Sequence, residues 1–300
     1  MVRPAAFAFN EQTAVSNAFQ QAPTTLSGIA ESARTEFDAA IAQLQAAGVA
    51  VWVIEDTGQP VKPDAVFPNN WISTHSDGTV VLYPMCTPNR RLERRADVVA
   101  QLKAGYQVSR IIDLSPYEQQ DRFLEGTGSI VFDHDARIAY ACLSVRTDAG
   151  ILEELCRQIG YTPFTFHAAD ELGQAIYHTN VIMGIGSGYA VLCLECIPDP
   201  AERQALTSLL ERSGKAIIAI DQAQVKAFAG NVLSLRNKEG KALLALSASA
   251  EAALRPEQKK RLQQWTELLP LSIPLIESIG GGSVRCTIAQ NFLTPNIPLG

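Results

Sequence analysis

Cys286 has the surroundings that most favour chemistry in this sequence. It follows three consecutive glycines, 280–282, in the segment Gly-Gly-Gly-Ser-Val-Arg-Cys. A glycine run lets the backbone bend sharply and lets a ligand approach closely. A thiolate is a strong nucleophile at neutral pH when a neighbouring positive charge lowers the pKa of the thiol. Because a lone cysteine is more commonly a small core residue, the prediction of a nucleophile depends on its partners.

His178 and Glu125 are two further side chains whose types suit acid–base chemistry. His178 lies in Tyr-His-Thr-Asn-Val. An imidazole can give a proton to a leaving amine and later take one from water. Glu125 precedes Gly-Thr-Gly, where a carboxylate can orient a histidine, hold it protonated or accept N–H bonds from a substrate. Taken singly, each residue is more commonly structural. A lone histidine is more often a hydrogen-bonded part of the fold, and a lone glutamate before a turn more often lies on the surface.

A unit that is repeated five times positions these residues. In each unit an amphipathic stretch is followed by an apolar run and a polar loop, and the stretches end every 54 to 57 residues. Self-similarity at a fixed period is typical of repeat folds, in which loops on one side converge on one site. The stretches end at Gly48, Gly105, Gly160, Gly214 and Pro270.

The pattern also places the elements of each unit. Helices are predicted at about 28–47, 91–104, 148–159, 199–213 and 256–269. Strands are predicted in the apolar runs 49–54, 106–114, 161–167, 215–220 and 271–276. The loops that carry the unusual residues are 67–71, 125–129, 178–180, 229–231 and 280–286.

Each unit is also predicted to contain a β-hairpin, and the five units are predicted to close into a ring. Segments 130–143, 181–194 and 232–246 each contain two apolar runs around a short turn rich in Gly, Asp or Asn. Each unit is therefore roughly ββαβ, with strands inside and helices outside. We expect the five units to close into one α/β ring over residues 1–300, because closure removes exposed sheet edges.

Composition excludes several classes of function. The formal net charge is −6 and 19% of residues are charged, so no basic field favours nucleic acid. The start of the chain lacks the apolar core of a signal peptide, and no run of about 18 apolar residues predicts a membrane span. Six cysteines form no dense disulfide pattern. We therefore expect a reduced, cytoplasmic protein, and the sequence leaves homo-oligomerisation open.

No motif predicts a metal or an organic cofactor. Cys193 and Cys196 have the spacing of half a zinc site, but no second matching pair exists. The Gly-Ile-Gly-Ser-Gly segment at 184–188 is predicted to be a hairpin turn without the helix that a dinucleotide site requires. A thiolate and an imidazole can supply the nucleophile and the proton transfers alone.

Taken together, these residues resemble the guanidine-modifying (pentein) superfamily of arginine deiminases, dimethylarginine hydrolases, agmatine deiminases and amidinotransferases. The resemblance implies a five-bladed α/β propeller with pseudo-fivefold symmetry and a Cys-His-Glu site at its centre. It covers nearly the whole chain and is nearest to the citrulline-utilisation hydrolase branch, described in bacteria as amidinotransferase-like. The segments that carry it are 9–14, 66–71, 124–129, 177–181 and 280–290.

The resemblance also implies roles for single residues. Cys286 matches the nucleophile, His178 the general acid/base, and Glu125 the carboxylate that keeps the histidine protonated. Arg90 and Arg146 match two arginines that bind the α-carboxylate of the substrate, which guanidinium groups can hold in bidentate fashion. The alternative for both arginines is surface salt bridging.

Two departures from the deiminase pattern bear on the substrate. Asn70 and Asn180 stand in loops where arginine deiminases carry acids. A cationic guanidinium favours carboxylates, whereas an asparagine both donates and accepts and so matches a neutral ureido group. This difference favours citrulline over arginine. If these asparagines only cap turns, arginine stays open.

The sequence therefore predicts an enzyme of arginine metabolism that cleaves a C–N bond of a small amino acid. The main prediction is hydrolysis of citrulline to ornithine, CO₂ and ammonia through a thiocarbamoyl intermediate on Cys286. The alternative is an arginine deiminase or a hydrolase of a substituted arginine. An amidinotransferase and a non-catalytic pentein-fold binding protein are less favoured.

Overall fold

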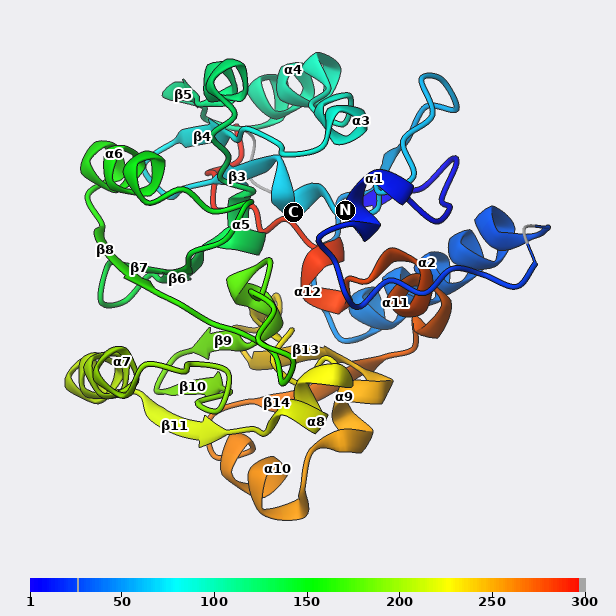
Figure 1. The fold of residues 1–300 in the computed structure, drawn as a ribbon. Coiled ribbons are helices and arrows are strands. Elements are labelled where there is room, and N and C mark those ends of the chain that lie inside the picture. The colour runs from blue at the N-terminus through cyan, green and yellow to red at the C-terminus, as the bar shows by residue number, and fades with distance from the viewer. Residues whose placement is uncertain (26, 297–300) are drawn as a thin grey trace.

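Five small sheets surround a common centre, and the longer helices lie outside them (Figure 1). The computed structural model describes residues 1–25 and 27–296. Four sheets have three strands each, in which two antiparallel strands are followed by a helix and a parallel third strand. The predicted α/β fold of five small sheets is confirmed, but only four units are ββαβ, because the fifth sheet has just two parallel strands.

The four larger sheets follow one another along the chain. Their strands are β3 (Ile72–Thr74), β4 (Thr79–Leu82) and β5 (Arg110–Asp113); β6 (Val131–Asp133), β7 (Ile138–Cys142) and β8 (Thr162–Phe166); β9 (Met183–Gly186), β10 (Tyr189–Leu192) and β11 (Ala216–Ala219); and β12 (Leu233–Arg236), β13 (Ala242–Ser247) and β14 (Glu267–Leu271). The fifth sheet pairs β1 (Val2–Arg3) with β2 (Ile54–Glu55) in parallel.

Two classes of helix accompany the sheets. The longer ones are α2 (Ile29–Ala46), α4 (Ala96–Gly105), α6 (Ala149–Ile159) and α7 (Pro200–Arg212). The shorter ones are α1 (Glu11–Ala14), α3 (Pro88–Arg91), α5 (Gly126–Ser129), α8 (Gln222–Lys226), α9 (Ala248–Ala253), α10 (Pro256–Leu262), α11 (Pro274–Gly280) and α12 (Val284–Thr287), with short 3₁₀ helices η1 (Pro68–Asn70), η2 (Ser115–Gln120) and η3 (Thr179–Val181).

Helix α6 shows why the outer helices form where they do. The Asp148 side chain accepts a hydrogen bond from the backbone N–H of Ile151 and caps the first turn. Gly160 follows the last turn with φ 72°, a conformation that costs glycine little. Between these ends, one face of the helix is buried against the second sheet. The capping residue, the apolar stripe and the glycine stop are all readable from the sequence.

Two of the predicted helices were wrong in extent. The helix predicted at 91–104 is broken into α3 and α4, because Arg94 turns back to bond Glu118 and the carbonyl of Tyr83. The helix predicted at 256–269 ends at Leu262, and β14 pairs with β13 across the end of that range. Pairing with a sheet outweighs a helical pattern here, and β14 is an edge strand, where Pro270 is tolerated.

The strand boundaries shift with these helices. Of the run predicted at 49–54, only Ile54 belongs to a strand. Part of the run predicted at 271–276 is the start of α11, where Pro274 occupies the first turn.

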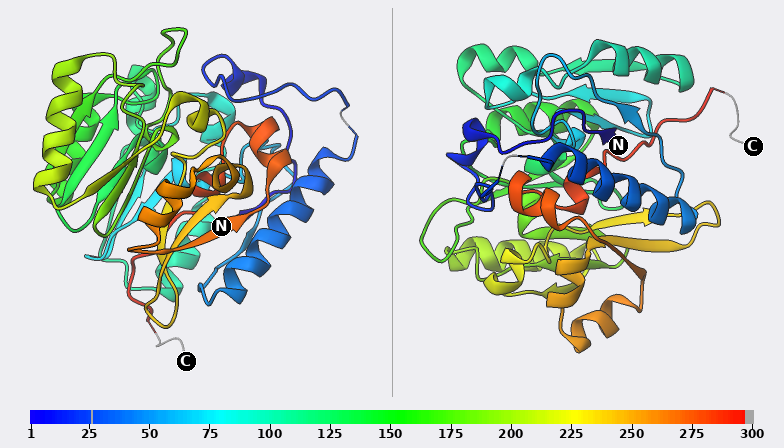
Figure 2. Two further views of the ribbon diagram at one scale, coloured as in Figure 1. Left: turned by 90° about the horizontal axis from the view of Figure 1, so that it is seen from below. Right: turned by 90° about the vertical axis from the view of Figure 1, so that its right-hand side faces the viewer.

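Both ends of the chain help to close the ring. Strand β1 joins β2, and the backbone N–H of Gln107 bonds the carbonyl of Thr294 near the other end. Helix α2 packs beside α11, as the right-hand view of Figure 2 shows. Segments that are far apart in the sequence therefore meet at the junction between the fifth and first units.

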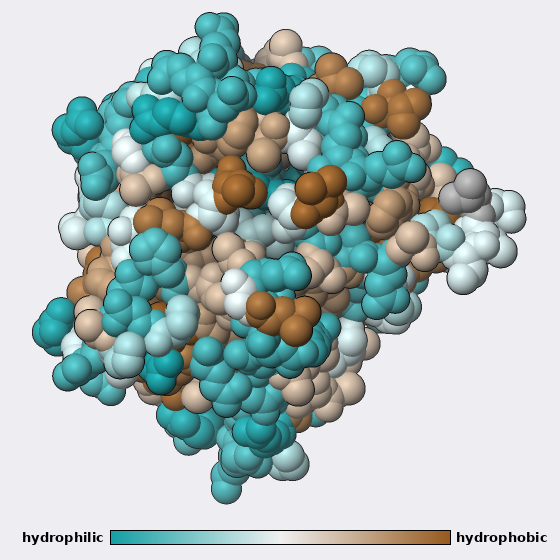
Figure 3. Space-filling view, viewed as in Figure 1, coloured by the Kyte–Doolittle hydropathy of each residue, from teal (hydrophilic) through white to brown (hydrophobic). Residues whose placement is uncertain are grey.

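The surface is mixed in character. In Figure 3, brown apolar residues on the viewed face are separated by teal polar ones. Among the residues that the structure describes, the large apolar side chains that are exposed are Val15, Val61, Leu92, Val145 and Leu172. Across residues 1–25 and 27–296, no helix combines the length and the apolar character that crossing a bilayer would take.

Candidate active site

Four short turns meet near the centre of the ring. Turn α5 contacts both η1 and η3, and α12 contacts η1. Figure 1 shows α5 and α12 pointing inward from their sheets. Each turn carries or adjoins a predicted site residue: Asn70, Glu125, Asn180 and Cys286. The equivalent positions of these loops in the repeat therefore bring the four turns into one region, and the roles of the four residues stay predictions.

Glu125 and His178 form a buried pair. Their Oε2 and Nε2 atoms are 2.8 Å apart, and the two residues are 0% and 2% exposed. The other oxygen of Glu125 accepts the backbone N–H of Cys86 at 2.9 Å. A carboxylate only accepts hydrogen bonds, so Nε2 of His178 carries the proton. This leaves Nδ1 as the basic nitrogen of the imidazole.

The predicted charge of His178 was wrong for the free protein. Burial lowers the pKa of His178 to about 4, and Glu125 opposes this only in part. Burial would raise the pKa of Glu125, but Arg146 and His178 hold it well below its usual range. At neutral pH the pair is thus a carboxylate and an uncharged imidazole. Glu125 orients His178 without keeping it protonated.

Cys286 lies in a pocket of amide groups. Its Sγ atom is 3.3 Å from Nδ2 of Asn231 and 3.5 Å from Nδ2 of Asn180, and the residue is 4% exposed. Burial raises the pKa of the Cys286 thiol, while the hydrogen bonds from Asn231 and Asn180 lower it. Asn231 also donates to the backbone carbonyl of Asn180 at 3.0 Å.

Sequence reasoning missed Asn231. It ends the fourth loop of the repeat, at a place matching Asn70 and Asn180 in the first and third loops. That shared position was the available signal.

Asn70 and Asn180 each keep an unused polar atom. Nη1 of Arg90 donates to Oδ1 of Asn70 at 2.8 Å, which fixes the orientation of that amide because a guanidinium only donates. Nδ2 of Asn70 and Oδ1 of Asn180 are buried without a partner. These two atoms are a spare donor and a spare acceptor. Both amide atoms of Asn69 and one oxygen of the buried Asp64, whose carboxylate lies 3.8 Å from Arg90, also lack a partner, whereas Glu125 is already engaged.

Arg90 is buried among protein groups. It makes two hydrogen bonds of 2.9 Å to Glu93, and Nη2 also reaches the carbonyl of Phe67 at 3.2 Å. Together with its bond to Asn70, these contacts leave Arg90 few free N–H groups. Glu93 was also missed by sequence reasoning, although its position three residues after Arg90 in the chain was visible.

Arg146 is engaged in the same way. Its Nη1 lies 3.4 Å from Glu125, Nη2 donates to the carbonyl of Thr13 at 3.0 Å, and Ser16 accepts from two of its nitrogens. Neither Arg90 nor Arg146 is on the surface, so surface salt bridging does not describe them. Bidentate binding of a substrate carboxylate would require both to leave present partners. The two-arginine clamp stays a proposal.

The N-terminal segment covers this region. Besides the contacts of Thr13 and Ser16 with Arg146, Asn17 donates to the carbonyl of Gly281 at 3.2 Å and Gln20 to that of Ile279 at 3.1 Å. These bonds join the segment to both the second unit and the glycine run. The reacting side chains are consequently closed off from solvent.

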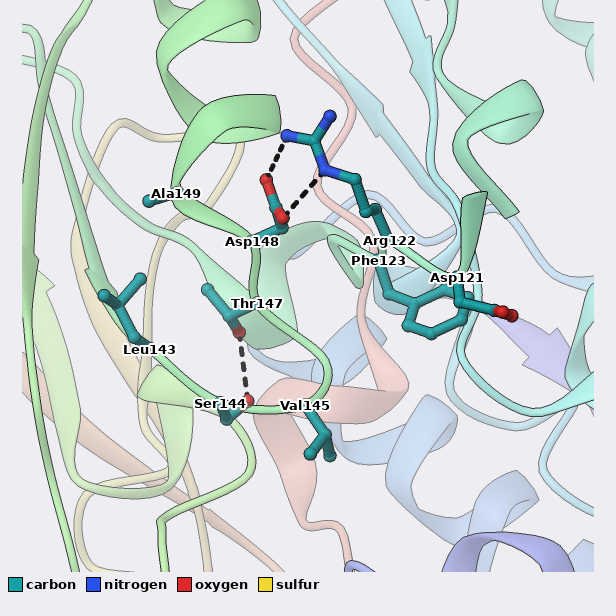
Figure 4. Close-up of a pocket in the computed structure, with 9 residues that line it drawn as sticks. All are labelled: Asp121, Arg122, Phe123, Leu143, Ser144, Val145, Thr147, Asp148 and Ala149. Carbon is teal, nitrogen blue, oxygen red and sulfur yellow. Dashed lines mark hydrogen bonds and ion pairs between the residues drawn. The ribbon is translucent and has the colours of Figure 1, made fainter. Parts of the chain in front are cut away.

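A polar cavity lies beside the loop that carries Arg146. Its volume is about 290 Å³, and Figure 4 shows Arg122 paired with Asp148 and Ser144 turned toward Thr147 along its wall. None of Cys286, His178 and Glu125 lines it. The cavity adjoins the candidate site without being the place where the reacting groups meet.

Gly128 gives a direct test of this geometry. A Cβ atom there would lie 2.3 Å from Nδ2 of Asn70 and 2.6 Å from Nδ1 of His178. We therefore expect Gly128→Ala to displace both groups and to lower kcat/KM by roughly 10²-fold or more. Gly105→Ala is the matched control, because a Cβ there meets nothing within 4 Å. Equal activity of the two variants in a steady-state assay would contradict the placement of His178 and Asn70.

Metal-ligating side chains do not gather into a site in the part of the chain that the structure describes: no group of three or more His, Cys, Asp or Glu is placed to hold an ion there. Cys193 and Cys196 lie with their sulfur atoms 3.2 Å apart in the core. Both are buried behind the third sheet.

Comparison with known proteins decides the family. The model of eukaryotic N,N dimethylarginine dimethylhydrolases matches residues 3–293. The chain belongs to this family. It is accordingly a guanidino-modifying hydrolase of the pentein superfamily. A search of the curated proteins gave no match.

Solved structures agree on the fold of this dimethylarginine dimethylhydrolase family member. The N-terminal domain of ArgZ, an arginine dihydrolase from the ornithine–ammonia cycle in Cyanobacteria, superimposes with a TM-score of 0.75 at 15% identity, covering 98% of each chain. AgrE bound to L-arginine gives 0.74 at 16% identity, over 96% of this chain and 39% of AgrE. A dimethylarginine dimethylaminohydrolase gives 0.63 at 13% identity, over 95% and 96%.

Proposed function

We propose that this protein hydrolyses the guanidino group of arginine or of an N-substituted arginine, with residues 1–300 acting as one catalytic domain. The observation that carries the proposal is that Asn180 contacts the Cys286 sulfur from the short turn η3, which directly follows His178, the partner of Glu125. Membership of the dimethylarginine dimethylhydrolase family supports an arginine-type substrate. The alternative prediction from the sequence, hydrolysis of arginine or a substituted arginine, is thus better supported than hydrolysis of citrulline.

The proposed first half-reaction forms a covalent bond to Cys286. The thiol proton passes to Nδ1 of His178, the basic nitrogen of that ring. The thiolate attacks the guanidino carbon and gives a tetrahedral adduct. The imidazolium then returns the proton to the departing nitrogen, so that ammonia or an alkylamine leaves. An amidino group remains on the sulfur.

The second half-reaction consumes water. His178, again uncharged, takes a proton from water as its oxygen attacks the same carbon. Collapse of the second tetrahedral adduct breaks the C–S bond, restores Cys286 and releases citrulline. Glu125 stabilises the imidazolium that forms transiently in each half-reaction, because its carboxylate accepts a hydrogen bond from Nε2–H of His178 at 2.8 Å.

A second candidate function is hydrolysis of citrulline to ornithine, CO₂ and ammonia, as in the citrulline-utilisation branch that the sequence resembles. The spare donor on Asn70 and the spare acceptor on Asn180 favour it. A ureido group has one carbonyl to accept from the first and N–H groups to donate to the second. In that reaction the thiocarbamoyl group would remain on Cys286 until water releases it.

Replacing Asn70 with aspartate tests this second function. The substitution exchanges the spare N–H donor for a negative oxygen, while Arg90 can still donate to the other oxygen. We expect kcat/KM for citrulline to fall by about 10- to 100-fold relative to that for arginine, the effect of losing a hydrogen bond in a buried site. Asn70→Ala is the control, because it removes the amide without adding charge. An unchanged substrate preference in Asn70→Asp would remove the support for a ureido substrate.

Product analysis tests the proposal as a whole. Purified protein is incubated separately with arginine, dimethylarginine and citrulline, and the amino acids and amines are quantified. Citrulline from either of the first two compounds is the expected result. Ornithine from citrulline would establish the second function. No turnover of any of the three would overturn both.

A further inference from the structure

Arg285 is a buried cation without an acidic partner. It immediately precedes Cys286 in α12 and is 5% exposed. Its Nη1 donates to the backbone carbonyl of Val232 at 3.1 Å, and its Nε is buried with no hydrogen-bond partner. Val232 follows Asn231, so this bond ties the guanidinium to the loop that also contacts the Cys286 sulfur.

The other buried cations are paired. Within residues 1–25 and 27–296, each other buried Lys or Arg lies within 4 Å of a carboxylate: Lys62, Arg90, Arg146 and Lys215. Burying an unpaired charge is unfavourable, and side chains that impose such a cost gather at functional sites. The absence of a carboxylate at Arg285 therefore points to a different anion.

The surroundings of Cys286 identify that anion. The elements packed most closely against α12 are η1 and β13, and neither contains a charged residue. Arg285 also helps to lower the pKa of His134, but an imidazole cannot supply a negative charge to balance the guanidinium. The carboxylate of Glu277 reaches the same turn and accepts hydrogen bonds from Ser283 and Ser249, but among the described residues it forms no ion pair with Arg285. Tyr177 also faces the sulfur, and burial raises the pKa of its phenol far above neutrality, so it is uncharged. The group beside Arg285 that can become negative is the thiol itself.

The charge of Arg285 persists at neutral pH. Burial lowers the pKa of its guanidinium to about 10, and the charge of Cys286 acts in the opposite direction. The interaction is mutual, because Arg285 also favours the ionised form of Cys286. Burial and the hydrogen bonds from the two asparagines have larger effects on the pKa of that thiol than Arg285 has. Arg285 and Asn231 both lower this pKa and so oppose the effect of burial.

We propose that Arg285 is a positioning residue that stabilises the thiolate of Cys286. The inference rests on the proposed role of Cys286 as nucleophile. It extends that role by assigning the source of positive charge to the neighbouring residue instead of His178, which is uncharged in the free protein. A thiolate titration tests it without substrate, so its failure and a failure of the proposed function are separable.

The experiment follows thiolate absorbance at 240 nm from pH 5 to pH 11. Wild type, Arg285→Met and Arg285→Lys are each measured against the same protein with Cys286→Ala, which subtracts the other five cysteines. Each protein is also unfolded with urea at neutral pH. Because methionine removes the buried charge, a charge kept for function predicts that Arg285→Met is at least as stable as wild type.

We expect the Cys286 titration to move up by about one pH unit or more in Arg285→Met and to stay near the wild-type position in Arg285→Lys. An unmoved titration in Arg285→Met would overturn the proposal, as would a lysine variant shifted as far as the methionine variant. Should Arg285→Met fail to fold, Arg285→Gln replaces it under the same criteria, since glutamine can still donate to the Val232 carbonyl.

Discussion

Cys286→Ala is expected to abolish hydrolysis, with a loss of at least about 10³-fold in kcat, because no other group supplies the nucleophile in the proposed cycle. The fold should be unaffected. The sulfur accepts only weak hydrogen bonds from Asn231 and Asn180. The measurement is steady-state turnover together with the urea midpoint.

The matched control for that variant is Cys156→Ala. Cys156 is fully buried in the core between α6 and the second sheet and lies outside the candidate site. Its truncation should cost stability through the small cavity that it leaves, while kcat is unchanged. Turnover that survives in Cys286→Ala, or an equal loss in Cys156→Ala, would contradict the mechanism.

Arg146→Ala is expected to have the largest effect on stability. The two charges of the Arg146–Glu125 pair are 2% and 0% exposed, and removing the arginine leaves a carboxylate beside an uncharged imidazole. Breaking a buried pair in this way typically costs about 3–5 kcal/mol of the free energy of unfolding. Arg146 also holds Thr13 and Ser16, so the N-terminal cover should loosen.

Arg122→Ala provides the comparison for that prediction. Arg122 pairs with Asp148 at 2.7 Å, but the two side chains are 38% and 28% exposed. A pair this accessible contributes only about 0–1 kcal/mol. Urea unfolding of both variants gives the difference. If Arg146→Ala costs no more than Arg122→Ala and only raises KM, Arg146 serves to bind a substrate carboxylate instead.

Much of the fold was predictable because local patterns carry it. Helix α6 is marked by its Asp148 cap, its apolar stripe and its Gly160 stop. The convergence of the loops that carry Glu125, His178 and Cys286 was also predictable, because these loops occupy matching points of the repeat, while the catalytic roles of the three residues stay predictions. In a closed ring, residues at the same point of successive repeats lie at equivalent places around the centre.

What the sequence did not predict depends on tertiary surroundings. The charge of His178 follows from burial, which no local pattern reveals. Arg90 turns inward because Glu93 and Asn70 meet it, and the last of these is distant in sequence. Leu262 ends its helix because the following residues pair with β13. The family match supports an arginine derivative better than the citrulline that the two asparagines suggested, so citrulline stays a prediction.

Thiol labelling with substrate protection tests whether an arginine-type substrate is presented to Cys286. Protein is treated with a limiting amount of iodoacetamide, with and without dimethylarginine or citrulline, and each cysteine peptide is quantified by mass spectrometry. Solvent exposure alone would favour modification of Cys86, because it is half-buried whereas the other five cysteines are buried. We predict that Cys286 is modified and that the compound turned over protects it, whereas glutamate does not. Labelling of Cys86 alone, or labelling of Cys286 that no substrate slows, would contradict the account.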